Sequence, residues 1–295
     1  MTSATHRLFC FGLGYSAAAL AGALRGEGWQ IAGTCRSAER AGALAARGID
    51  AQRFDRGHPL ADAAAALAGA THVLVSVPPD EAGDPVLELH EADLAASETV
   101  EWVGYLSSTS VYGDRRGGWV DETSALAPRG ARALARVAAE DAWLDLWHRY
   151  GLPVHLFRLA GIYGPGRSAI DQLRAGTAKR VEKPGHLFSR IHVDDIVQVL
   201  RASMARPNAG AIYNVCDDEP APAAEVVEHA SRLLGVAPPP LVPLEKAGLS
   251  PAALGFYAES RRVRNERIKR ELGVTLRHPD YRRGLAACLT GGRPS

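Results

Sequence analysis

Short apolar runs alternate with alanine-rich stretches along the first half of the chain. The apolar runs are rich in Val, Ile and Leu without strict alternation, which is typical of strands buried on both faces of a sheet. We expect strands at 8–11, 30–35, 51–54, 73–77, 103–107, 154–159 and 212–215, and helices at 16–25, 38–47, 60–68, 87–98 and 131–150. Because strand–helix–strand repeats form right-handed crossovers, the pattern predicts an α/β fold with a doubly wound parallel sheet.

The regular alternation ends near Gly164. Beyond it the pattern predicts loops, a helix from about 194, the returning strand at 212–215 and a helix at 223–234. We therefore expect two domains, one over 1–164 and a smaller, partly interleaved C-terminal substrate lobe over 165–295.

Composition and net charge indicate which classes of binding partner can be expected for this protein. The chain has 295 residues, 46% of them apolar and 23% charged, with a formal net charge of +1. These values are ordinary for a globular protein and give no reason to expect nucleic acid or an anionic membrane as a partner. No leader precedes the first motif, and no apolar run approaches the ~18 residues of a membrane span. We expect a cytoplasmic protein.

A glycine motif follows the first predicted strand. Gly12, Gly14 and Ala17 form G-x-G-x-x-A at the junction with the first helix, which Tyr15 and Ser16 open. Gly12 allows a tight turn, Gly14 lets the backbone approach a pyrophosphate, and Ala17 permits close packing of helix on strand. The free N–H groups and the dipole at the helix start favour phosphate. The first domain is therefore expected to be a Rossmann domain that binds a dinucleotide.

The end of the second strand indicates which dinucleotide is bound. NAD sites usually place an acid about 20 residues after the glycines to hold the ribose hydroxyls. Here no acid occurs between Glu27 and Glu39, and Arg36 and Ser37 stand where a 2′-phosphate would lie. A guanidinium pairs well with phosphate. The predicted cofactor is therefore NADP(H).

Four further segments resemble one family. The segment 105–114 resembles the pattern SS-x-x-VYG, 157–167 resembles LR-x-x-x-x-YGPG, 190–195 resembles R-x-I-HV-x-D, and 211–215 resembles YN-V. In this order they resemble the extended short-chain dehydrogenase/reductase family, which contains nucleotide-sugar epimerases and dehydratases.

The resemblance implies roles for individual residues. It places Asp55 near the adenine, Val77 and Pro78 around the nicotinamide ribose, and Ile162 among the cofactor contacts. It aligns Ser108 with the catalytic Ser or Thr of the family, which hydrogen-bonds a substrate oxygen.

No metal site is predicted. The four cysteines lack C-x-x-C spacing and are interpreted as free thiols of a reducing compartment. His192 is interpreted as a core histidine and Asp194 as a helix cap.

The sequence departs from the family at its catalytic pair. The family carries Tyr-x-x-x-Lys on the helix predicted here at 131–150, where the Tyr exchanges a proton with the substrate and the Lys binds the ribose. When Ala139 and Glu140 are aligned with the closing AE of that helix, Arg132 takes the Tyr position and Arg136 the Lys position. Arginine does not exchange protons at neutral pH because its pKa exceeds about 12. Members with such changes are called atypical.

Other residues are left to carry the chemistry. Arg132 can stabilise an oxyanion or hold an anionic substrate group, and Arg136 can bind the cofactor ribose or phosphate. The proton donor stays open among Tyr112, Asp114 and a water held by Ser108.

Two functions therefore stay open. The first is an atypical, NADP(H)-dependent oxidoreductase or epimerase/dehydratase-like enzyme acting on a small anionic or sugar-like substrate. The second is a non-catalytic NADP(H)-binding sensor or scaffold. The missing Tyr–Lys pair favours this second function, whereas the substrate lobe and Ser108 favour the enzyme. The expected partner is a small molecule, with no nucleic acid or membrane, and a homodimer stays open.

Overall fold

The chain forms two compact units, each built from three stretches of sequence. The computed structural model describes residues 6–290. Unit 1 comprises Met1–Val111, Arg129–Arg158 and Val199–Tyr213, and unit 2 comprises Tyr112–Pro128, Leu159–Gln198 and Asn214–Ser295. The chain therefore passes repeatedly from one unit to the other. The predicted division of the chain into one domain over 1–164 and a second over 165–295 stays a prediction.

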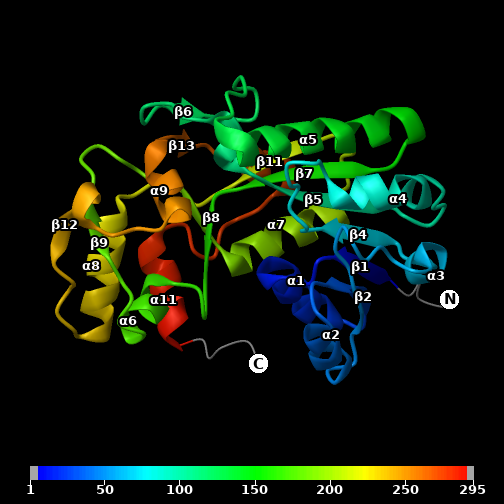
Figure 1. The fold of residues 1–295 in the computed structure, drawn as a ribbon, viewed down its shortest axis with the longest axis horizontal. Coiled ribbons are helices and arrows are strands. Elements are labelled where there is room, and N and C mark those ends of the chain that lie inside the picture. The colour runs from blue at the N-terminus through cyan, green and yellow to red at the C-terminus, as the bar shows by residue number, and fades with distance from the viewer. Residues whose placement is uncertain (1–5, 291–295) are drawn as a thin grey trace. The chain divides into compact units, whose positions relative to one another are not determined.

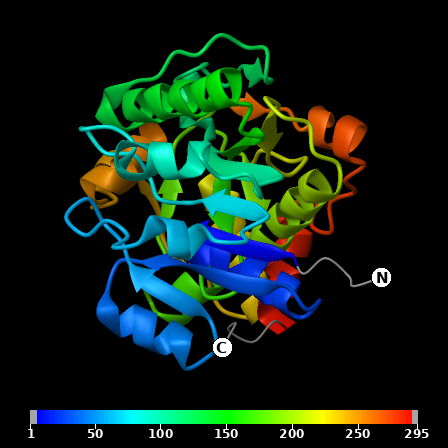
Figure 2. The same ribbon diagram turned by 90° about the vertical axis from the view of Figure 1, so that its right-hand side faces the viewer.

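A seven-stranded parallel sheet confirms the predicted fold class (Figures 1 and 2). Its spatial order is β11-β7-β5-β4-β1-β2-β3. The strands are β1 (Arg7–Phe11), β2 (Gln30–Cys35), β3 (Asp50–Arg53), β4 (His72–Val75), β5 (Trp102–Ser108), β7 (Val154–Leu159) and β11 (Ile212–Val215). Each begins within one residue of its predicted position.

The order of these strands determines where a ligand is expected. From β1 the chain builds β2 and β3 on one side, then returns and builds β4 on the other side of β1. In doubly wound sheets, ligands bind at the carboxyl ends of the strands where the direction of building reverses. That point lies here at the ends of β1 and β4.

The helices between these strands agree with prediction except at their ends. They are α1 (Tyr15–Arg25), α2 (Ala38–Ala45), α3 (Ala63–Leu67), α4 (Pro85–Ala95) and α5 (Gly130–Tyr150). The helix expected at 60–68 is shorter because Asp62 caps it, its side chain accepting the Ala65 N–H at 2.9 Å. The helix expected at 87–98 begins earlier because Asp84 caps it and Pro85 occupies the first turn.

Unit 2 has its own core and several short strand pairs that the sequence pattern did not predict. The pairs are β8 (Gly161–Tyr163) with β10 (Arg190–His192), β9 (Arg180–Glu182) with β12 (Leu241–Pro243), and β6 (Trp119–Val120) with β13 (Arg262–Val263). The remaining helices are α6 (Ala169–Arg174), α7 (Val193–Ala205), α8 (Ala223–Leu234), α9 (Pro251–Ala258), α10 (Glu266–Leu272) and α11 (Tyr281–Thr290). The core packs α6, α8 and α11 around buried side chains that include Ile170, Ala230 and Leu285.

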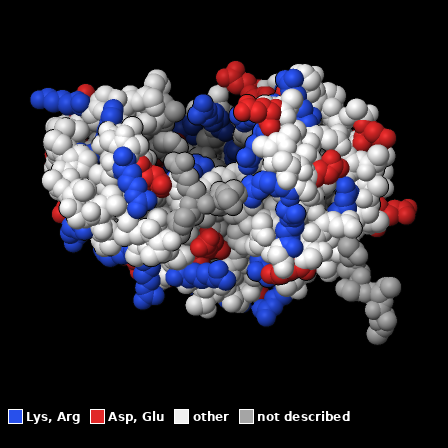
Figure 3. All heavy atoms as spheres, turned by 90° about the horizontal axis from the view of Figure 1, so that it is seen from below, with Lys and Arg blue, Asp and Glu red and all other residues white. Residues whose placement is uncertain are grey.

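Basic and acidic side chains are both present on the face that Figure 3 draws, and the net charge of the chain is +1. Among residues 6–290 no helix is both long and apolar enough to cross a membrane.

A buried histidine joins three segments of unit 1. The Nδ1–H of His155, in β7, donates to the carbonyl of Val103 at 3.2 Å, and its Nε2 accepts the Asn208 N–H at 2.9 Å. Both contacts require the neutral ring, since Nε2 can accept only when it carries no proton. Burial lowers the pKa of His155 from 6.5 to about 4.

We expect this histidine to make folding sensitive to acid. The unfolded chain binds a proton at His155 more readily than the folded chain, so its contribution is present above pH 6.5 and is lost as the pH falls toward 4. The free energy of unfolding should drop by about 2 kcal/mol between about pH 7 and pH 5 from this group. Urea denaturation of His155→Gln should show a correspondingly weaker pH dependence, whereas His148→Gln, an exposed control, should match the wild type. Equal pH dependence in all three proteins would contradict the assignment.

Candidate functional site

The glycine turn between β1 and α1 is tightly fixed. Gly12 has φ +89°, a conformation that L side chains rarely adopt. Its N–H donates to Thr34 Oγ1 at 2.9 Å, and its carbonyl accepts the Ser76 hydroxyl at 2.5 Å. A Cβ on Gly12 would lie 2.9 Å from Ser76 Oγ and 3.1 Å from Val77 Cγ2. The packing of unit 1 itself therefore requires glycine at this position.

The second glycine of the motif has a different explanation. Gly14 caps α1 with φ −81° and ψ −165°, an extended conformation open to any residue. A Cβ there would meet only Ser76 Oγ, at 4.0 Å. The protein's own packing does not require glycine at this position. Close approach of a phosphate group to the backbone does require it. Tyr15 and Ser16 form the first turn of α1, where helix amides favour anions. These residues fit a dinucleotide pyrophosphate.

Val77 and Pro78 follow β4 and lie beside this turn. Val77 packs on the core of unit 1 and contacts the position that a Gly12 Cβ would occupy, while Pro78 is exposed. The structure therefore brings together the predicted residues at the ends of β1 and β4.

Arg36 and Ser37 come directly after β2. Arg36 is exposed, and no ion pair joins it to an acidic side chain in the described part of the chain. The Ser37 hydroxyl caps α2 by accepting the Arg40 N–H at 3.2 Å. Within residues 6–290, therefore, no acidic side chain pairs with the guanidinium at this strand end.

Asp55 lies in the loop after β3 and organises that loop. Its carboxylate accepts the Gly57 N–H at 2.9 Å and contacts His58 Nδ1 at 2.7 Å and Arg53 at 3.2 Å. The hydrogen bond with His58 is the main cause that lowers the pKa of Asp55, so the group is ionised at neutral pH.

A buried ion pair lies beneath the end of β5. Glu140 of α5 and Arg158 of β7 are 1% and 3% exposed, and Arg158 donates to both carboxylate oxygens at 2.7–3.1 Å. The Ser107 hydroxyl also donates to Glu140. One carboxylate therefore joins α5, β5 and β7, and it holds the residue that precedes Ser108.

Ser108 is the last residue of β5 and is half-buried. Its hydroxyl oxygen accepts the Ser110 N–H at 3.2 Å. The hydroxyl proton can still be donated to another acceptor, since a serine both donates and accepts.

The two arginines of α5 differ in their surroundings. Arg136 is half-buried, and one of its nitrogens donates to Tyr105 Oη and to the Leu106 carbonyl, both at 3.0 Å. Arg132, one turn earlier, is exposed. Packing therefore fixes Arg136 against β5 and leaves the Arg132 guanidinium in contact with solvent.

The remaining predicted residues belong to unit 2. Tyr112 is fully buried, and its hydroxyl donates to Asn214 Oδ1 at 2.7 Å. Ile162, in β8, pairs with Ile191 of β10. The carboxylate of Asp114 accepts the backbone N–H groups of Arg116 and Ser260 at 3.0 and 2.9 Å. The hydroxyl of Tyr112 and the carboxylate of Asp114 are thus both engaged in bonds within unit 2.

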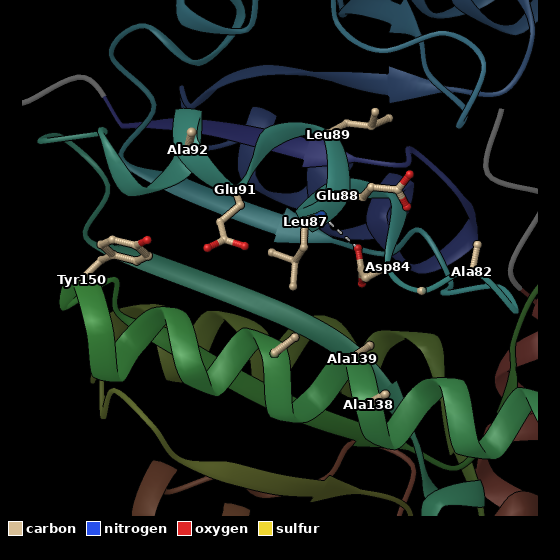
Figure 4. Close-up of a pocket in the computed structure, with 12 residues that line it drawn as sticks. Ala82, Asp84, Leu87, Glu88, Leu89, Glu91, Ala92, Ala138, Ala139 and Tyr150 are labelled. Carbon is tan, nitrogen blue, oxygen red and sulfur yellow. Dashed lines mark hydrogen bonds between the residues drawn. The ribbon is translucent and has the colours of Figure 1, made fainter.

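Unit 1 also carries a groove that contains none of these residues. It has a volume of about 710 Å³ and lies between α4 and α5, lined by Leu87, Glu91, Ala138, Ala142 and Tyr150 among others (Figure 4). It holds no residue of the glycine turn, so its size does not make it the dinucleotide site.

A comparison with models of known protein families identifies the family of this chain. Residues 14–216 match the model of the NAD dependent epimerase/dehydratase family. The chain belongs to this family. The match begins at Gly14, includes the α5 arginines and extends through β11, and it confirms the resemblance that the motifs carry.

The chain is also similar to individual proteins over almost its whole length. Protein YeeZ from Escherichia coli K12 is 30% identical over 281 residues, which cover 91% of this chain and 95% of that protein. A solved structure described as a functionally unknown conserved protein from Silicibacter pomeroyi DSS is 49% identical, covers 98% and 100% of the two chains, and superposes with a TM-score of 0.88.

A more distant epimerase has the same fold. UDP-glucuronic acid 4-epimerase from Bacillus cereus, solved with NAD, is 15% identical, covers 95% and 96% of the two chains, and has a TM-score of 0.77. At this identity the likeness shows the fold alone.

Sequence reasoning missed the roles of Glu140 and Arg158 in this family member. The signal was present, because Arg158 interrupts an apolar run and Glu140 shares a helix face with Ala133 and Trp143. A charge at a core position usually has a buried partner. The pattern does not identify that partner, however.

We expect this ion pair to be critical for folding. Glu140→Gln keeps the side-chain shape but leaves the Arg158 charge buried without a counter-charge. It should lower the free energy of unfolding by about 3 kcal/mol or more. Asp141→Asn, exposed on the same helix, should change it by less than about 0.5 kcal/mol. Urea denaturation measures both, and similar small effects would show that the pair contributes little.

Proposed function

We propose that this protein is an NADP(H)-dependent oxidoreductase or epimerase that acts on a small anionic or sugar-like substrate. The observation that carries the proposal is Gly14, a glycine that the protein's own packing does not require and that a pyrophosphate would. Family membership supports a nicotinamide dinucleotide. The NAD in the Bacillus cereus epimerase is consistent with it.

The preference for NADP(H) rests on Arg36. Its guanidinium is exposed at the end of β2 and has no acidic partner in the described residues. A 2′-phosphate would supply that missing negative charge. Ser37 and the first turn of α2 lie next to it.

The other proposed cofactor contacts are those that the family resemblance implies. We assign Gly12, Gly14, Tyr15 and Ser16 to the pyrophosphate, and Asp55 to the adenine. Val77, Pro78 and Ile162 would line the cofactor. Arg136 would reach the ribose, because its two bonds to β5 come from one nitrogen and a guanidinium carries five N–H donors.

The chemistry depends on residues near the end of β5. The bound nicotinamide supplies a centre that accepts or donates hydride. Ser108 would donate a hydrogen bond to the substrate oxygen, and Arg132 would hold a carboxylate or phosphate without exchanging a proton. The Tyr112 hydroxyl, bonded to Asn214, would release its proton only by breaking that bond.

A sensor or scaffold is the second candidate, because α5 carries Arg132 and Arg136 where the family has its Tyr and Lys. Both candidates need the dinucleotide. They differ in whether a second ligand binds beside it.

The first test concerns cofactor choice. The wild type should bind NADPH more tightly than NADH in a fluorescence titration. Arg36→Ala should lose about 1–3 kcal/mol of NADPH affinity and little NADH affinity, as expected for one charge-assisted contact. Gly14→Val should abolish binding of both while circular dichroism reports an intact fold. Equal affinity of the wild type for the two dinucleotides would contradict the NADP(H) assignment.

The second test concerns the substrate anion. With NADPH present, a screen of small carboxylates and sugar phosphates should yield a ligand whose affinity falls about tenfold in Arg132→Ala, about the energy of one charge-assisted bond. Arg129→Ala, an exposed arginine at the start of the same helix, is the matched control and should bind normally. If no anion binds, or both variants behave like the wild type, the anion role of Arg132 fails and the sensor candidate gains.

A further inference from the structure

Three side chains with metal-binding atoms converge in unit 2. His192 ends β10, Asp194 lies in the first turn of α7, and His278 lies in the segment before α11. His278 Nε2 is 3.4 Å from Asp194 Oδ2, and His192 Nδ1 is 3.6 Å from the same oxygen. The two imidazole centroids are 4.1 Å apart, and the three ligand atoms all lie within 4.8 Å of one another.

Neighbouring groups hold these side chains in place. The buried Asp195 carboxylate accepts the backbone N–H groups of Arg277 and His278 at 2.6 and 3.1 Å, which anchors the segment carrying the second imidazole. His192 is 1% exposed and packs edge-on against the Tyr163 ring at 5.2 Å. The cluster is therefore preorganised by packing and by backbone hydrogen bonds, which a metal site requires.

The spacing suits a tetrahedral ion. Metal–ligand distances of 2.0–2.2 Å, as for Zn²⁺ with His and Asp, place neighbouring ligand atoms about 3.4 Å apart. The two distances to Asp194 are close to this value. The Asp194 N–H now donates to His192 Nδ1 at 3.2 Å, a long bond that a cation at the same lone pair would replace.

The donor set selects the class of ion. Two imidazoles and one carboxylate suit Zn²⁺ and its first-row neighbours, whereas Mg²⁺ and Ca²⁺ prefer oxygen ligands. The Asp194 side chain is 48% exposed, so an ion can enter from solvent and keep water as a further ligand. All four cysteines are buried. The sulfur of Cys288 lies 3.8 Å from His192 Nε2, which is not the ring nitrogen that faces Asp194.

We infer that His192, Asp194 and His278 form a binding site for a divalent transition-metal ion of the Zn²⁺ class. The ion would link the end of β10 and the start of α7 to the segment before α11. The inference does not depend on the proposed function, because none of the three residues is assigned there to the dinucleotide or the substrate.

The test uses the full chain, free of any histidine tag and stripped of metal with a chelator. Calorimetric titration with Zn²⁺ should give one site per chain, and Zn²⁺ but not Mg²⁺ should raise the thermal unfolding midpoint. Asp194→Asn and His278→Ala should each weaken binding by about tenfold or more. His148→Ala, an exposed histidine on α5, should bind like the wild type.

Cobalt provides a readout of the ligand set. The Co²⁺-loaded protein should show a visible absorption band of a low-symmetry N/O site without thiolate-to-metal charge transfer. A thiolate band would overturn the three-residue set, because it would place Cys288 in the site. Failure of the wild type to bind one Zn²⁺, or unchanged binding in both Asp194→Asn and His278→Ala that remain folded, would overturn the inference.

Discussion

The buried ion pair between Glu140 and Arg158 is the constraint on which the rest of unit 1 depends. Two charges removed from water are stable only when they meet at good geometry and their remaining hydrogen-bonding capacity is satisfied. Arg158 meets the carboxylate through two nitrogens, and Ser107 contributes a further donor. Any slide of α5 along the sheet would separate these groups, so the pair sets the register of the helix against β5 and β7.

That register determines the surroundings of the two arginines of α5, Arg132 and Arg136. With α5 held in place, one nitrogen of the half-buried Arg136 donates to Tyr105 and to the Leu106 carbonyl. Arg132, one turn away, meets solvent. A second buried bond, from Trp143 Nε1 to Asp84 at 3.1 Å, ties the same helix to the start of α4. The two cations therefore differ in exposure and in hydrogen bonding, although the sequence does not distinguish them.

The features that could be predicted from the sequence are those that depend on residues close together along the chain. The strands, most helices and the turn at Gly12 follow from periodicity and from a backbone conformation that one residue type satisfies. The helix starts at Asp62 and Asp84 differ from prediction because capping side chains, not apolar periodicity, set them. The roles of Ser108 and Arg132 stay predictions, because they depend on contacts with a bound ligand and not on contacts within the chain.

Features that join distant parts of the chain could not be predicted in this way. The pairing of β9 with β12 involves three residues on each side, too few for a periodic signal. His192 was interpreted as a core histidine, and its burial agrees with that, but its neighbour His278 lies 84 residues beyond Asp194. The spacing of residues along the sequence does not predict a contact between side chains this far apart, because the contact forms only in the folded chain.

The alternation of the chain between two units has a consequence for biosynthesis. Unit 1 includes Val199–Tyr213, so it cannot be completed until residue 213 has been synthesised. Until β7 emerges, β5 is the edge of a growing parallel sheet, with unpaired backbone groups along a strand made of buried residues. A nascent chain that includes α5 but not yet β7 would expose both this unpaired strand edge and a Glu140 without its partner Arg158, a state from which chains can associate wrongly.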